Sequence, residues 1–237
     1  MSGKSYRHEI KELLSPVQTC LLEQRIRAVL QPDANGSGGR YQIRSIYFDT
    51  LSDKAYTEKE DGISRREKIR IRFYDCQPGL IKLERKEKRR DLIAKDSLII
   101  SKETADAMIN GDYKSLTSYG SPLANSVYSL ACAEGLHPVV VVDYVRNAYT
   151  YPVGNVRITF DSLLYAGRPD LPVWQPGGGM NVLGDNTILE IKFNDYLAEH
   201  IRRLLCSVPG ERIALSKYTL CRRNLLWKQG DFLSGKD

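Results

Sequence analysis

The chain has 237 residues, a formal net charge of +6 and a hydrophobic fraction of 42%. This length and composition allow one large β-rich domain or two small ones, and enough apolar residues for a packed core. No apolar run approaches the roughly 18 to 20 residues that span a bilayer, and the scattered cysteines lack metal or redox spacing. We therefore expect a cytoplasmic protein with reduced thiols and no transmembrane segment.

The first part of the chain alternates strands with helices. In chain order, the pattern predicts a strand over 6–13, a helix over 16–31, a strand over 41–49 and a short helix over 52–61. Ser15 followed by Pro16 is typical of a helix start, because serine caps the helix and proline fits its first position. In the first strand, Arg7, Glu9 and Lys11 share one face, so this face is charged.

The most basic stretch is 65–95. It holds twelve Lys or Arg and five acids, which leaves +7, whereas the other 206 residues sum to −1. Basic and apolar side chains alternate along 68–73. After a turn at 76–79, Ile81 and Leu83 alternate with Lys82, Glu84, Lys86 and Lys88. This pattern predicts an antiparallel hairpin with one cationic face. Like charges across a hairpin are destabilising, so acids, water or a bound anion must neutralise this face.

The second half of the chain contains further strands and several amphipathic helices. In chain order, we expect a strand over 92–100, a helix of about ten residues that Ser101 begins, a helix over 122–136, strands over 139–151, 156–164 and 187–194, and helices over about 196–206 and 213–227. The segment 165–186 is rich in proline and glycine, and we expect it to be irregular.

At least five of about eight strands carry charged residues on one face and apolar residues on the other. Amphipathic helices need an apolar partner, which favours a sheet with helices outside and the charges inside. We therefore predict an α+β fold: a closed antiparallel β-barrel tunnel of about eight strands with helices packed outside, as a single domain over 1–237. The alternative is an ordinary core with a solvated charged face.

The ordered set of short motifs resembles the bacterial VTC-domain polyphosphate polymerases, within the triphosphate tunnel metalloenzyme (CYTH-like) superfamily. The matching segments are Arg7-His8-Glu9-Ile10-Lys11, Ser45-Ile46-Tyr47-Phe48-Asp49, Arg70-Ile71-Arg72, Leu83-Glu84-Arg85-Lys86, Tyr144-Val145-Arg146, Val156-Arg157-Ile158-Thr159, Leu189-Glu190-Ile191-Lys192 and Ser216-Lys217-Tyr218. Each motif is weak alone, but together they cover nearly the whole chain.

The resemblance implies a site that binds phosphates and a divalent metal ion. The catalytic residues that it implies are Arg70, Arg72, Arg146, Arg157 and Lys192. Further substrate phosphates would be bound by Lys11, Lys86, Lys95, Tyr144, Ser216 and Lys217. Glu190 matches the metal-binding glutamate, for Mn²⁺ or Mg²⁺. Glu9 and Glu84 are interpreted as partners of nearby cations, and Asp161 as either a metal-side acid or a neighbour of Arg157.

The implied activity is transfer of the γ-phosphate of ATP to inorganic polyphosphate, with ATP and polyphosphate as partners and no nucleic acid. Other protein partners are left open. The superfamily's Glu-x-Glu-x-Lys is here Arg7-x-Glu9-x-Lys11, and the missing acid favours the polymerase over a two-metal hydrolase. The alternatives are a triphosphatase acting on inorganic triphosphate or a nucleotide, and a non-catalytic binder of polyphosphate or nucleic acid.

Overall fold

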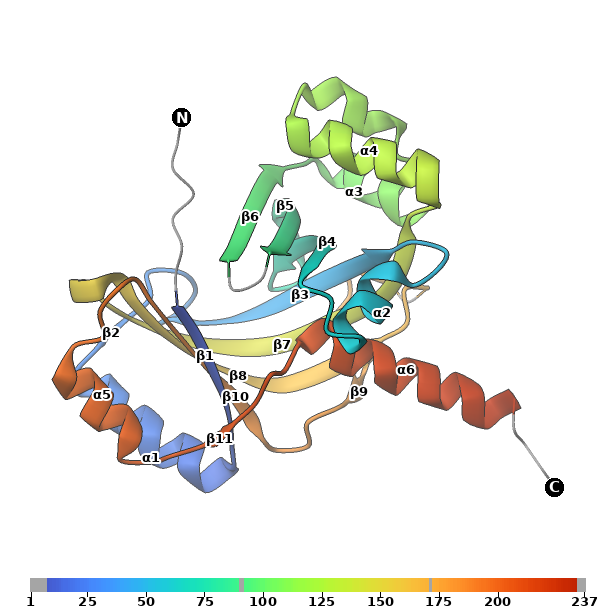
Figure 1. The fold of residues 1–237 in the computed structure, drawn as a ribbon. Coiled ribbons are helices and arrows are strands. Elements are labelled where there is room, and N and C mark those ends of the chain that lie inside the picture. Colours follow the sequence, from blue (N-terminus) through green and yellow to red (C-terminus); the bar gives the residue numbers. More distant parts are fainter. Residues whose placement is uncertain (1–7, 90–91, 171, 234–237) are drawn as a thin grey trace. The chain divides into compact units, whose positions relative to one another are not determined.

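The computed structural model describes residues 8–89, 92–170 and 172–233 (Figure 1). Arg7 lies outside the described residues. The chain passes back and forth between two compact units. The first unit comprises Met1–Gln42, Tyr144–Leu164 and Leu183–Leu215, and the second comprises Ile43–Asp143, Tyr165–Val182 and Ser216–Asp237. The assignment of one domain to the whole chain stays a prediction.

In the first unit, antiparallel strands carry one charged and one apolar face. Its strands are β1 (His8–Leu14), β2 (Gln31–Pro32), the first part of β8 (Val156–Gly167), β10 (Thr187–Phe193), β11 (Glu211–Arg212) and the end of β7 (His137–Tyr151). β10 pairs with β1 on one side and with β8 on the other. Lys11 lies opposite Glu190, and Glu190 lies opposite Thr159, so polar side chains share one face.

Two helices cover the apolar face of the first unit. These are α1 (Pro16–Arg27) and α5 (Glu199–Cys206), which lie on the same side of the strands (Figure 1). Leu22 and Ile26 of α1 and Ile201 of α5 pack with Ile158 and Leu189 in one buried cluster. The predicted start of α1 is confirmed, because the side chains of Ser15 and Gln18 form a reciprocal capping box and Pro16 follows the cap.

The second unit contains a meander of long strands. These are β3 (Arg40–Asp49), β4 (Arg65–Tyr74), β5 (Gln77–Arg89) and β6 (Leu92–Ile99), while the short β9 (Met180–Asn181) pairs with the end of β8. The helical elements of this unit are α2 (Lys54–Glu60), α3 (Lys102–Ile109), the 3₁₀ helix η1 (Lys114–Tyr119), α4 (Pro122–Glu134) and α6 (Lys217–Leu233). A second 3₁₀ turn, η2 (Val153–Asn155), belongs to the first unit.

The apolar face of this meander is also covered by helices. Ile71 of β4 and Leu83 of β5 pack with Met108 of α3, Leu116 of η1 and Val127 of α4 in one buried cluster. These apolar positions alternate with the basic positions of β4 and β5, so the cationic face lies on the other side of the meander. The predicted hairpin of β4 and β5 and its two-faced character are confirmed.

The prediction of a closed antiparallel β-barrel is wrong. The structure is an α+β fold whose antiparallel sheet has 11 strands in the hydrogen-bonding order β11-β1-β10-β8-β7-β3-β4-β5-β6, with β2 on β7 and β9 on β8. In the described part of the chain, β11 and β6 end this order and the sheet is not closed. Alternation assigns the two faces of each strand, but closure also requires matching tilt and register between the outermost strands. The outermost β11 has only two residues and offers no long edge.

A helix that crosses a bilayer must be both long and apolar. In residues 8–89, 92–170 and 172–233, no helix combines the length and the apolar composition that this requires.

Candidate functional site

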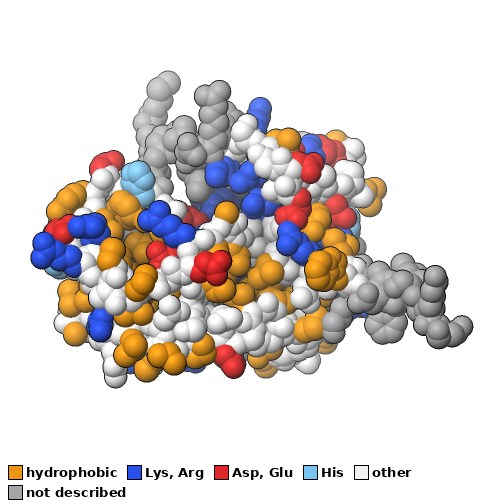
Figure 2. Space-filling view, turned by 60° about the horizontal axis from the view of Figure 1, so that its bottom comes forward, with side chains coloured by type: hydrophobic (Ala, Val, Ile, Leu, Met, Phe, Trp, Pro, Cys, Tyr) orange, Lys and Arg blue, Asp and Glu red, His pale blue; other side chains and the backbone are white. Residues whose placement is uncertain are grey.

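Basic side chains crowd one face of β4, β5 and β6 in the second unit, which we call the cation face. The basic residues that define it are Lys68, Arg70, Arg72, Lys82, Lys86 and Lys95. Within these three strands, the one carboxylate of the described residues on this face is Glu84. The register pairs Arg72 with Lys82, and Lys86 with both Lys68 and Lys95, so like charges do lie directly opposite each other. Figure 2 shows Lys and Arg side chains gathered near the centre of one view of the molecule.

Glu84 is the centre of this face and only 1% of its surface is exposed. Arg70 donates to Oε2 of Glu84 from Nε at 2.7 Å and approaches it with Nη2 at 2.6 Å. Nζ of Lys95 lies 2.5 Å from Oε1, and Nε of Arg72 lies 3.9 Å from Oε2. Burial alone would raise the pKa of Glu84, but Arg70, Arg72 and Lys95 outweigh burial and lower the pKa to about 2.

This arrangement predicts a pH-dependent loss of stability that Glu84→Gln removes. The carboxylate has a folded pKa of about 2 against an ordinary value of 4.5. Its contribution is therefore full above pH 4.5 and is lost as the pH falls toward 2, with an amplitude of about 3 kcal/mol. Urea unfolding from pH 6 to pH 2 measures this slope. Equal slopes in the wild type and in Glu84→Gln would contradict the prediction, and the exposed Glu211→Gln serves as the control.

Two polar residues of β3 support the arginines of the cation face. Arg70 donates from Nη1 to the Tyr47 hydroxyl at 2.8 Å, and Arg72 donates from Nε to Oγ of Ser45 at 3.2 Å. The sequence analysis did not assign Ser45 and Tyr47 to the site as individual residues. Their signal was present, because they occupy alternate positions of a predicted strand and therefore share one face.

The start of α6 joins the same face. Lys68 donates from Nζ to Oγ of Ser216 at 2.7 Å, and this Nζ lies 4.9 Å from the centre of the Tyr218 ring. Tyr218 is buried, and its hydroxyl donates to Oδ2 of Asp49 at 2.5 Å. Lys217 is the first residue of α6, directly after Ser216. Lys68 was not among the predicted site residues, although its place in the alternation of 68–73 was evident.

The charged face of the first unit carries basic and acidic residues in nearly equal number, unlike the cation face. Its basic residues are Lys11, Arg146, Arg157 and Lys192, and its acids are Glu9, Asp161 and Glu190. Nζ of Lys11 lies 2.9 Å from Glu9 and donates to the carbonyl of Leu215 at 3.2 Å. Nζ of Lys192 lies 2.5 Å from Oε1 of Glu190 and 4.0 Å from Oε2 of Glu9. Carboxylates therefore lie between the cations.

Asp161 forms an ion pair with Arg146. The guanidinium of Arg146 donates to both carboxylate oxygens of Asp161, at 2.6 and 2.7 Å, and Asp161 is fully buried. Burial alone would lower the pKa of Arg146, but Asp161 reverses this and the pKa is raised well above its ordinary value. Arg146 also lies over the Tyr144 ring, 5.4 Å from its centre. Arg157 pairs instead with Asp33 and donates to the Tyr41 hydroxyl at 2.9 Å.

Glu190 and Thr159 are suited to a divalent metal ion that is held mainly by phosphates. Residues 8–89, 92–170 and 172–233 contain no group of three or more His, Cys, Asp or Glu side chains arranged to hold a metal. Glu190 is 6% exposed and lies opposite Thr159, whose buried hydroxyl has no hydrogen-bond partner among the described residues. Mg²⁺ typically takes one or two carboxylates plus substrate phosphates and water. The unpaired hydroxyl fits a coordinated water or a phosphate oxygen.

The predicted residues are therefore gathered on one charged face in each unit. The cation face of the second unit, with the start of α6, holds Arg70, Arg72, Lys86, Lys95, Ser216 and Lys217. The charged face of the first unit holds Lys11, Tyr144, Arg146, Arg157, Glu190 and Lys192. Their roles in catalysis, phosphate binding and metal binding stay predictions. Three further residues were not assigned as individuals: Asp33 and Tyr41 beside Arg157, and Thr159 beside Glu190.

The chain matches a known protein family. The model of the VTC domain matches residues 6–226 of this chain. The chain belongs to the VTC domain family. This membership confirms the resemblance drawn from the motifs and supports a phosphate-related enzyme, a phosphotransferase or a hydrolase. Members of the family generally depend on a divalent metal ion.

Solved structures share the fold of this VTC domain at low sequence identity. A Bacillus halodurans protein provisionally named an adenylate cyclase is 15% identical, with a TM-score of 0.53 over 90% of this chain and 95% of that chain. The PH1819 protein of Pyrococcus horikoshii OT3 is 16% identical, with a TM-score of 0.51 over 94% of this chain and 99% of that chain. No curated protein matches the sequence.

Proposed function

We propose that this VTC domain is a polyphosphate polymerase, which transfers the γ-phosphoryl group of ATP to the end of a growing inorganic polyphosphate chain. The excess of charge on the cation face carries this proposal. Six basic side chains surround the buried carboxylate of Glu84, which leaves a formal +5 for these residues. Basic residues at alternate positions of a strand recur about every 6 to 7 Å, so consecutive phosphates of a chain can be neutralised in series.

Phosphoryl transfer depends on positioning and charge neutralisation more than on a strong base. Arg70 and Arg72 present planar forks that bind phosphate oxygens at two points, and Lys68 and Lys86 add point charges. Glu84 is a positioning residue in this proposal, because its two short contacts with Arg70 hold the guanidinium before substrate arrives. Glu190 and Thr159 would hold the divalent ion, which would neutralise charge on the phosphates during transfer.

A polymerase and a hydrolase differ in the group that accepts the phosphoryl group. The terminal phosphate of a polyphosphate chain is already anionic, whereas a triphosphatase must take a proton from water. Two buried carboxylates, Glu84 and Asp161, are poor bases for activating water, because Glu84 has a pKa of about 2 and Arg146 donates to both carboxylate oxygens of Asp161. Because these two carboxylates are weak bases, transfer to an anionic phosphate is favoured over transfer to water. The triphosphatase remains the alternative.

The proposal is tested by incubating the purified protein with ATP and Mn²⁺, with Mg²⁺ in a parallel reaction. We expect ADP release together with a long anionic polymer, seen by gel electrophoresis and by phosphorus NMR, and little orthophosphate at early times. Orthophosphate in proportion to ADP, with no polymer, would replace the polymerase with the triphosphatase. Binding of polyphosphate without nucleotide turnover would indicate a non-catalytic binder.

A further inference from the structure

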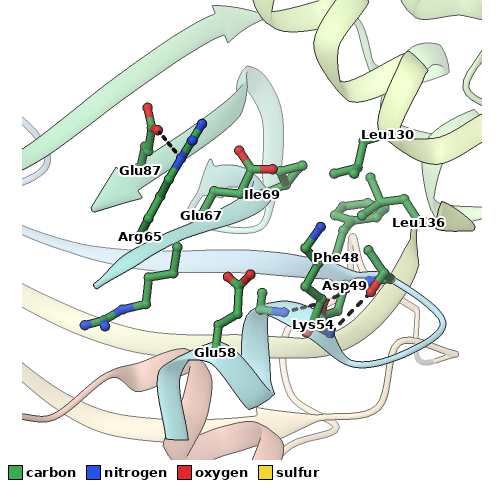
Figure 3. A pocket seen from close by; sticks show the side chains of 13 residues that line it. Phe48, Asp49, Lys54, Glu58, Arg65, Glu67, Ile69, Glu87, Leu130 and Leu136 are labelled. Carbon is green, nitrogen blue, oxygen red and sulfur yellow. Dashed lines mark hydrogen bonds and ion pairs between the residues drawn. The ribbon is translucent and has the colours of Figure 1, made fainter. Parts of the chain in front are cut away.

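A pocket of about 240 Å³ lies in the second unit, away from the cation face (Figure 3). Glu67 and Ile69 of β4 line it, and both alternate with Lys68 and Arg70, so they point to the opposite side of the strand. The other lining residues come from β3 and the residue after it, α2, the start of β4, β5, α4 and the segment after α4. None of the residues that the sequence analysis assigned to phosphate or metal binding lines this pocket.

One wall of the pocket is apolar. Phe48, Ile69, Leu130 and Leu136 line it, and Figure 3 shows Phe48, Leu130 and Leu136 near one another. The volume corresponds to that of about eight water molecules in the liquid. A small group with an aliphatic part can therefore enter and bury its methylene groups against this wall.

The rest of the pocket is mainly charged, and four carboxylates line it. The side chains of Glu58 in α2 and Glu67 in β4 make no hydrogen bond or ion pair with any described residue. Glu67 also lies directly opposite Glu87 in the register of β4 and β5, which places like charges together. Burial raises the pKa of Glu58, and Glu67 and Asp49 raise it further against the opposing effect of Lys54. Both carboxylates can therefore accept hydrogen bonds from a cationic group that enters the pocket.

The basic residues that line the pocket each have another partner, which for Arg65 is Glu87 of the same pocket. Nζ of Lys54 lies 2.9 Å from Oε1 and 3.0 Å from Oε2 of Glu134. Arg66 donates from Nη1 to the carbonyl of Ile63 at 2.6 Å, and the largely exposed Arg65 lies 3.7 Å from Glu87.

Asp49, a further carboxylate of the pocket, is satisfied within its own unit. It accepts hydrogen bonds from the backbone of Thr50, Ala55 and Tyr56 and from the hydroxyl of Tyr218. Glu87, the fourth acid, lies near Arg65, so Glu58 and Glu67 are the two acids of this pocket without a hydrogen bond or ion pair to a described residue.

We propose that this pocket binds an alkylammonium group, the chemistry of a lysine side chain or of a free polyamine. The ammonium donates to Glu58 and Glu67, and the methylene chain packs on the apolar wall, as lysine stems do on apolar surfaces. An anion would be repelled by these two carboxylates, which have no hydrogen bond or ion pair to a described residue. A bare divalent cation would want more oxygen ligands, and the described residues offer no group of three acids placed to hold one.

The first test is titration of the full chain with butylammonium chloride, followed by calorimetry and by two-dimensional amide NMR. We expect saturable binding, with shifts concentrated on α2 and β4. Butanol lacks the charge and ammonium chloride lacks the chain, so each should bind at least tenfold more weakly. Absence of saturable binding, or equal binding of butanol, would overturn the proposal.

Substitutions of Glu58 and Glu67 test whether butylammonium binds in this pocket. The Glu58→Gln/Glu67→Gln variant should fold, because neither side chain has a hydrogen bond or ion pair to a described residue, and should bind butylammonium at least tenfold more weakly. Glu211→Gln makes the same change of charge at an exposed residue of the first unit and should bind like the wild type. Should the double variant fail to fold, each single variant is measured instead. Unchanged binding in folded variants would place the amine elsewhere and refute the site.

Two further ligands distinguish the sources of the group. Spermidine represents a free polyamine, and a short peptide with one central lysine represents a partner protein. Stronger binding of spermidine supports a free polyamine, and stronger binding of the peptide supports a lysine side chain. If both fail to compete with butylammonium, the pocket does not serve this chemistry. Neither outcome depends on ATP turnover, so the proposed polymerase activity can fail without affecting this test.

Discussion

Replacement of Arg72 by glutamine is expected to lower polyphosphate synthesis from ATP by about 100- to 1000-fold, the usual effect of removing one preorganised donor from a developing anion. Arg72 lies on the cation face and is 8% exposed. Its guanidinium is 3.9 Å from Glu84, whereas Arg70 and Lys95 make the short contacts with that carboxylate. The loss of Arg72 therefore leaves Glu84 neutralised and the fold intact.

The matched control for this variant is Arg85→Gln. Arg85 lies in β5 but on the opposite face, where it contacts Asp96 and Ser126. Initial rates of ADP and polymer formation are measured for both variants, together with thermal unfolding with and without inorganic triphosphate. Triphosphate should raise the melting temperature of the wild type and of Arg85→Gln more than that of Arg72→Gln. Normal synthesis by Arg72→Gln would remove the cation face from the proposed mechanism.

Glu190→Gln is expected to abolish metal-dependent synthesis while polyphosphate binding is largely kept. The change removes a charged oxygen ligand and keeps the shape of the side chain. It therefore weakens binding of the divalent ion more than binding of the phosphates. The variant also leaves Lys192 and Arg146 with one acid fewer nearby. Binding of polyphosphate should then persist or tighten even as turnover is lost.

The measurement is a titration of activity with Mn²⁺, paired with calorimetry of polyphosphate binding. Glu199→Gln is the control, because Glu199 is in the same unit but on α5, where it pairs with Arg202 and Arg203. Thr159→Val, which removes the unpaired hydroxyl beside Glu190, should raise the Mn²⁺ concentration needed for half-maximal activity. An active Glu190→Gln enzyme with an unchanged Mn²⁺ response would refute the metal assignment.

Local patterns in the sequence were sufficient for the elements and for the faces of the strands. The alternation along 68–73 placed the basic residues of β4 on one face, because a strand has only two faces and a period of two. Ser15 and Pro16 located the start of α1, since capping depends on residues within one turn of the helix. The ordered motifs, read together, also led to the VTC domain family.

Pairings between distant residues were decided by the tertiary structure. The sequence left Asp161 between a metal and Arg157, and folding placed it on Arg146, 15 positions away. Lys68 and Ser216 are 148 positions apart, and no local pattern links them. An ion pair depends on where two strands lie next to each other and in which register, and a one-residue slip would present the opposite face.

The open order of the sheet and the pocket beside Glu58 and Glu67 have the same origin. Alternation predicted a charged face but not whether the sheet closes, because closure depends on the fit between edge strands that are far apart in the chain. The pocket combines side chains from several elements, and the packing of α2 and the β4–β5 hairpin leaves Glu58 and Glu67 without a hydrogen bond or ion pair to a described residue. The sequence by itself determined which residues share a face, and only packing determined which charges are neutralised.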